Sequence, residues 1–119
     1  MYKFYNANSK GNFVNDCVVR AISLAENKTW NETYKELSRI AEKNGILLDD
    51  VNFVEPLLDS RYKRCCFYNT TVKQFVDNHQ KGVYLITMPN HITCCIDGCV
   101  YDVFDCTNKT MKCAWFVSK

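Results

Sequence analysis

The stretch that decides the fold is VYLITMPNHITCCIDGCVYDVF, at residues 83–104. It contains three short runs of apolar, β-branched and aromatic residues, and Pro89-Asn90 separates the first run from the second. Asp97-Gly98 separates the second run from the third, and Asp-Gly between two such runs is the strongest short signal for a two-residue hairpin turn. We therefore expect strands over residues 83–88, 91–96 and 99–104.

The residues on the N-terminal side of this stretch carry helical signals. Asn15-Asp16 can cap a helix over residues 17–25, whose apolar residues share one face, so we expect that helix to be buried. The segment 29–32 is a capping box for a second helix, which Gly45 ends. Shorter helices are expected near residues 50–58 and 71–78.

A further strand is expected over residues 113–117, so the chain has helices first and strands afterwards. This order predicts an α+β fold in which N-terminal helices pack on a C-terminal, four-stranded antiparallel sheet. Residues 1–15 are polar and rich in Asn, and we expect a loop or an edge strand there. A length of 119 residues is that of one domain, so we expect a single domain over residues 1–119.

The composition is that of an ordinary globular chain, with 47% hydrophobic and 24% charged residues. A net charge of +2 without any basic run argues against a nucleic-acid partner. No apolar stretch approaches the roughly 20 residues of a membrane span. The first residues lack the apolar core of a signal peptide, so we expect a cytoplasmic protein that has no membrane partner.

The chain has eight cysteines, at positions 17, 65, 66, 94, 95, 99, 106 and 113. The cytosol keeps thiols reduced, so we expect no disulfide framework. The nearest metal-like set is His91, Cys95, Cys99 and Cys106, and its spacing matches no zinc pattern. We therefore expect no metal and no cofactor, and we expect most of the cysteines to be small apolar core residues.

Cys17 differs from the other cysteines because it begins a helix. The helix dipole favours a thiolate there and lowers the pKa of the thiol. His91 begins a strand, and the chain returning from the hairpin carries Asp102 and Asp105. A nucleophile, a base and an orienting carboxylate are the parts of a Cys-His-Asp triad. Arg20, on the same helix as Cys17, is expected to form a structural ion pair or a helix contact.

The motifs NDCVVRAI (residues 15–22), KGVYL (81–85) and HITCCIDGCVYDVFD (91–105) resemble, in this order, those of papain-like cysteine peptidases. They are closer still to small proteins of phages and mobile elements in Firmicutes that are predicted to have this fold. The resemblance covers most of the chain and implies a papain-like fold, with Cys17 as nucleophile and His91 as general base. It implies hydrolysis of an amide or isopeptide bond in a protein or peptide, within the bacterial host cell if a phage encodes the protein.

Two arguments disagree about the third member of the triad. A two-residue turn at Asp97-Gly98 puts Asp102 on the same face of the hairpin as His91. The family, however, places this group about 15 residues after the histidine, which favours Asp105, and one bulge would turn Asp105 to the correct face. We expect Asp105 to be the third member, with Asp102 as the runner-up.

The oxyanion hole is the point at which the chain departs from the family. Papain-like enzymes add a Gln about six residues before the nucleophile, and this chain has Gly11 there. Asn12 and Asn15 are the nearest substitutes, beside the backbone amide of Cys17. A second function class therefore stays open, a catalytically weak or inactive scaffold that binds a host protein and inhibits a host defence system. A thiol-rich zinc-binding or redox module is a third, and the sequence leaves the oligomeric state open.

Overall fold

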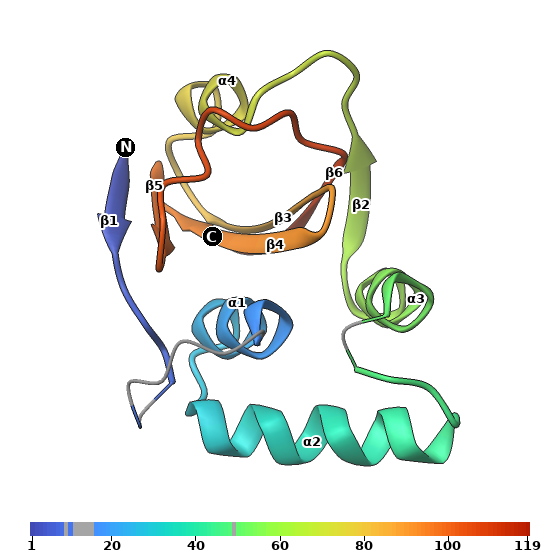
Figure 1. Cartoon of the computed structure of the whole chain (residues 1–119). Helices are drawn as coiled ribbons and strands as arrows, with labels where there is room; N and C mark the ends of the chain where they lie inside the picture. Colours follow the sequence, from blue (N-terminus) through green and yellow to red (C-terminus); the bar gives the residue numbers. More distant parts are fainter. Residues whose placement is uncertain (9, 11–15, 49) are drawn as a thin grey trace.

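The structure of the chain is a computed structural model that describes residues 1–8, 10, 16–48 and 50–119. Helices lie on both faces of one curved, mixed sheet, which confirms the α+β class (Figure 1). The described strands are β1 (Tyr2–Phe4), β2 (Lys63–Cys66), β3 (Val83–Met88), β4 (His91–Ile96), β5 (Cys99–Asp102) and β6 (Cys113–Ser118). The helices are α1 (Cys17–Ala25), α2 (Trp30–Lys43), α3 (Val51–Arg61) and α4 (Val72–Asp77).

The sheet has the strand order β1-β5-β4-β3-β6-β2. Strand β1 runs parallel to β5, and all other neighbours are antiparallel. The prediction of four antiparallel strands is therefore incomplete, because β1 and β2 extend the sheet at its two edges. Both edge strands are short, and all four residues of β2 are exposed, so neither shows the alternation of buried and exposed residues that identifies a strand in a sequence.

Local signals place the helices where the sequence predicts them. The Thr29 and Thr71 side chains each accept a hydrogen bond within a complete capping box, which starts α2 and α4 respectively. Gly45 follows α2 with φ +63°, in the left-handed region that glycine adopts without strain. Helices α1, α2 and α3 lie on one side of the sheet, with α1 between the sheet and α2, and α4 lies on the other side (Figure 1).

Side chains that alternate along the strands form a core on each face of the sheet. Leu85 and Cys94 pack with α1, α2 and α3, whereas Ile86 and Cys95 point to the opposite face and pack with α4. Cys94, Cys95 and Cys106 are fully buried, which confirms that these cysteines are core residues. No helix in the described ranges has the length and the apolar character needed to cross a bilayer.

One pair of cysteines departs from the expected reduced state. Cys66 of β2 lies directly opposite Cys113 of β6, with 4.1 Å between their Cα atoms, and the two are joined by a disulfide. The prediction of reduced thiols is therefore wrong at this pair. The pairing depends on the register of β2 against β6, and the sequence analysis expected no strand at β2. The other six cysteines have free thiols.

The hairpin of β4 and β5 positions the candidate site. Asp97 and Gly98 both have positive φ, and Ile96, Cys95 and Cys94 face Cys99, Val100 and Tyr101 in continuous register. Thr93 therefore comes opposite Asp102, and His91 lies two residues further along on the same face. The hairpin thus brings His91 and Asp102 together at the end far from its turn.

Candidate active site

Cys17 is the first residue of α1, and its half-buried side chain opens into a cavity. The cavity has a volume of about 550 Å³ and is lined by residues of α1, α3, the β3–β4 turn and the segment before β6. His91 lines the same cavity, and its ring interacts with the Cys17 thiol. The structure therefore brings together the predicted nucleophile and the predicted base, which are far apart in the sequence.

The ring of His91 is held on its other side by Asp102. His91 Nε2 and Asp102 Oδ2 are 2.6 Å apart, and the two side chains are only 9% and 4% exposed. Since Nε2 is engaged with Asp102, Nδ1 is the ring atom left for the thiol and for a substrate. The Phe104 ring lies 4.8 Å from the imidazole ring, centroid to centroid, and covers it with an apolar surface.

Asp102 is fixed through both its backbone and its side chain. Its carbonyl oxygen accepts hydrogen bonds from the Tyr2 hydroxyl at 3.0 Å and from the Tyr5 amide at 2.9 Å. Its Oδ1 accepts from the Val103 amide at 2.7 Å. Burial opposes ionisation of this carboxyl group, but the hydrogen bond with His91 and the charge of His91 help to outweigh burial and lower its pKa.

The thiol and the imidazole shift each other's pKa in opposite directions. Burial raises the pKa of Cys17, but hydrogen bonds with His91 and with the backbone of Ile92 outweigh it. The positive charges of His91 and Arg20 act in the same direction, so the pKa of Cys17 lies below its ordinary value. Burial likewise lowers the pKa of His91, but its hydrogen bonds, first of all that with Asp102, raise the pKa to about 11. The arrangement therefore favours a thiolate paired with an imidazolium.

Asp105 lies elsewhere. It is exposed, and its Oδ1 accepts hydrogen bonds from the amide and the hydroxyl of Thr107, at 3.0 and 2.6 Å. The structure therefore replaces Asp105 with Asp102 as the partner of His91. The physical reason is the continuous register of the hairpin, in which no extra residue turns Asp105 toward the histidine.

The predicted oxyanion residues have different outcomes. Asn12 and Asn15 lie outside the described residues. The backbone amide of Cys17 belongs to the first turn of α1, where amides have no partner within the helix, and it can donate to an anion formed beside the thiol.

Further side chains contact the site without having been assigned to it from the sequence. Besides Tyr2 they include Arg20, Phe104 and Cys106, and the Cys106 thiol donates to Asp102 Oδ2 at 3.8 Å. Asp16 and Arg20 are four residues apart on one helix, which signals a pair between them. Neither Arg20 nor Cys106 carries a local signal that points to Asp102, because these contacts depend on the packing of distant segments.

Comparison of the chain with protein-family models, curated proteins and solved structures found no match. The chemistry of the site is therefore argued from its own residues.

The site also contains a set of potential metal ligands. Ligand atoms of His91, Asp102 and Cys106 all lie within 4.8 Å of one another. Of the three cysteines in the metal-like set expected from the sequence, Cys106 lies close to His91. Asp102, which was not in that set, is the third potential ligand. Nitrogen, carboxylate and thiolate ligands of this kind suit zinc.

Proposed function

We propose that the protein is a papain-like cysteine hydrolase that cleaves an amide or isopeptide bond in a protein or peptide. The observation that carries the proposal is that Cys17 and His91 line one cavity, while Asp102 bonds to the His91 ring behind its wall. A papain-like fold is part of the proposal. It is supported by the nucleophile at a helix start and by the base and carboxylate on the two strands of one hairpin.

The proposed reaction begins with attack of the Cys17 thiolate on the substrate carbonyl carbon. The tetrahedral intermediate places its oxyanion near the Cys17 amide. His91 then donates a proton to the leaving amine, and the C–N bond breaks, which leaves a thioester on Cys17. Water attacks the thioester as His91 takes up its proton, and the products are a carboxylic acid and the free thiolate. Asp102 holds the ring and stabilises the imidazolium throughout.

The accessibility of Cys17 favours this proposal over an inactive binding scaffold. A decayed site would be expected to enclose its thiol, whereas Cys17 is half-buried and lines an open cavity. The half-exposed thiol, its lowered pKa and the place of His91 on the same cavity together support an active nucleophile.

A peptide vinyl sulfone probe tests the proposed function. We expect one probe per chain, attached to Cys17, and cleavage of some members of a mixed peptide library. Cys17→Ala is expected to abolish both results, and Cys65→Ala, which changes an exposed thiol on β2, is expected to preserve both. Probe attachment and peptide cleavage that persist in Cys17→Ala would contradict the proposal.

Zinc binding is the second candidate function, and the compact set of His91, Asp102 and Cys106 is the observation that favours it. A zinc ion there would occupy the atoms that join His91 to Asp102 and would displace the ring proton. On the hydrolase proposal, we expect no stoichiometric zinc by elemental analysis and no change in Tm on adding a chelator. One zinc per chain, lost in Cys106→Ala, would favour the metal site instead.

A further inference from the structure

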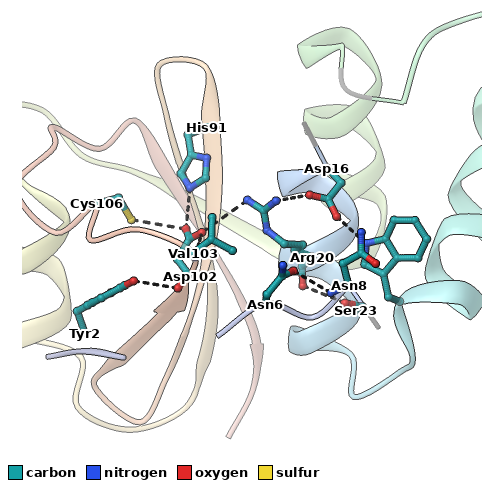
Figure 2. A network of polar contacts seen from close by, with 11 residues as sticks. Tyr2, Asn6, Asn8, Asp16, Arg20, Ser23, His91, Asp102, Val103 and Cys106 are labelled. Atoms are coloured by element: carbon teal, nitrogen blue, oxygen red, sulfur yellow. Dashed lines mark hydrogen bonds and ion pairs between the residues drawn. The ribbon is translucent and has the colours of Figure 1, made fainter. Parts of the chain in front are cut away.

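The buried guanidinium of Arg20 joins the two halves of the candidate site. Arg20 lies on α1, one turn after Asp16, and its Nη1 donates to Asp16 Oδ1. Its Nη2 lies 3.6 Å from Asp102 Oδ1, and the Arg20 side chain is only 10% exposed. Figure 2 shows Arg20 between Asp16 of the helix start and Asp102 of the hairpin.

We propose that Arg20 is a positioning residue that holds the helix start carrying Cys17 in place against the His91–Asp102 pair. This inference rests on the proposed function, because it assigns a role within the same site. It goes beyond the structural ion pair that the sequence suggests, because the guanidinium contacts the carboxylate that orients the base.

The first step of the argument concerns the helix start. Asp16 is the N-cap residue of α1 and immediately precedes Cys17. Its Oδ1 accepts from Arg20, and its Oδ2 accepts from Trp30 Nε1 of α2 at 2.8 Å. The position of Asp16, and with it the position of the thiol, is therefore tied to Arg20 and to α2.

The second step concerns the base. Asp102 uses Oδ2 for His91 and turns Oδ1 toward Arg20 and the Val103 amide. A carboxylate that is bonded at both oxygens cannot rotate freely. The contacts of Oδ1 therefore help to fix the direction in which Oδ2 points to the imidazole. Arg20 thereby connects the residue before the nucleophile to the residue behind the base.

The third step concerns the choice of arginine. A planar guanidinium presents several N–H donors in a fixed fork and can serve two carboxylates at once. A lysine keeps the positive charge but has one compact head on a flexible chain, so it cannot hold both carboxylates in the same geometry. A positioning role and a role of charge alone therefore predict different results for the substitution Arg20→Lys.

The measurement is the pH dependence of iodoacetamide labelling of Cys17, followed by mass spectrometry. The charged groups around the thiol are Arg20 and Asp16 of α1, His91 of β4 and Asp102 of β5. Glu55 of α3 and Lys112 line the same cavity. Because every variant keeps His91, Glu55 and Lys112, a change in the profile reports on the Arg20 contacts.

Arg20→Lys and Arg20→Gln are both expected to raise the midpoint of the labelling profile by about one pH unit. Both variants lose the guanidinium that contacts Asp16 and Asp102, so the helix start and the His91–Asp102 pair are no longer held in place relative to each other. If the labelling profile of Arg20→Lys matches that of the unchanged protein, the charge of Arg20 alone explains its effect, and the positioning role is overturned. Unchanged profiles in both variants would overturn it as well.

Arg61→Lys is the matched control. Arg61 is also a partly buried guanidinium that joins two carboxylates, with Nη1 at 2.8 Å from Glu26 and Nη2 at 3.0 Å from Glu36. It contacts neither Cys17 nor His91 in any described interaction. We expect Arg61→Lys to lower Tm and to leave the Cys17 profile unchanged. The Arg20 variants would give the same result if Arg20 had a structural role only.

Asp16→Asn covers the case in which the Arg20 variants do not fold. The Asp16 side chain makes no capping hydrogen bond to α1, so Asn keeps the shape of this residue and weakens its contact with Arg20. We expect Cys17 to label several-fold more slowly at neutral pH, and an unchanged rate would overturn the inference. If Cys17 of the unchanged protein labels only at the pH of an ordinary thiol, the proposed function and this inference both fail. If it labels at low pH in every variant, only the positioning role fails.

Discussion

Iodoacetamide is expected to alkylate Cys17 ahead of the other free thiols, and His91→Ala is expected to slow that reaction by about 10- to 100-fold at pH near 6.5. The thiolate is the reacting species, and it exists above the pKa of the thiol. The hydrogen bond from His91 and the charge of His91 hold the pKa of Cys17 below its ordinary value, so the thiolate is present at low pH. Without His91 the pKa rises toward the value of about 8.5 for a free thiol, and only about 1% of the thiol is then ionised at pH 6.5.

The effect of His91→Ala on the labelling rate is expected to depend on pH. The difference between the unchanged protein and His91→Ala is largest below the ordinary thiol pKa and disappears as the pH rises above it. The exposed Cys65 provides a reference rate within the same chain. His79→Ala is the matched control, because His79 stacks on Phe75, 3.9 Å between ring centroids, on the α4 side of the sheet. Equal rates at all free cysteines, or labelling of Cys17 only after unfolding, would refute an activated thiol.

The second large effect is expected from Asp102→Asn, which should lower the pKa of His91 and reduce hydrolysis by about 100-fold or more. Asp102 is the principal group that raises the pKa of His91, through a hydrogen bond of 2.6 Å and its negative charge. An amide of the same shape lacks that charge, so it stabilises the imidazolium less and the midpoint of the His91 titration falls. Titration of the His91 ring by NMR measures the shift directly.

Asp105→Asn is the matched partner of this experiment. It removes the same charge three residues later, at an exposed carboxylate bonded to Thr107. We expect the His91 titration and the reactivity of Cys17 to stay as they are. A His91 midpoint that moves in Asp105→Asn and not in Asp102→Asn would reverse the assignment and would require a bulge in the hairpin in solution.

The parts of the site that could be predicted from the sequence are those that local interactions specify. Cys17 begins a helix because apolar residues follow it at helical spacing. Asp16 occupies the N-cap position, but its side chain bonds to Arg20 and Trp30 rather than to an amide of α1. His91 begins a strand because a turn over Pro89-Asn90 precedes it and residues of strand type follow. The strand parity through Asp97-Gly98 also pointed to Asp102, whereas the family spacing favoured Asp105.

The sequence by itself determined the α+β class, the capping box at residues 29–32, the hairpin turn and the two residues expected to react. Each of these depends on neighbours within a few positions along the chain, whose preferences act before any packing. Only the tertiary structure decided the strand β2, the parallel pairing of β1 with β5, the disulfide of Cys66 with Cys113 and the contact of Arg20 with Asp102. These features join segments far apart in the chain, and their geometry is set by how the helices pack against the sheet and by the register between distant strands.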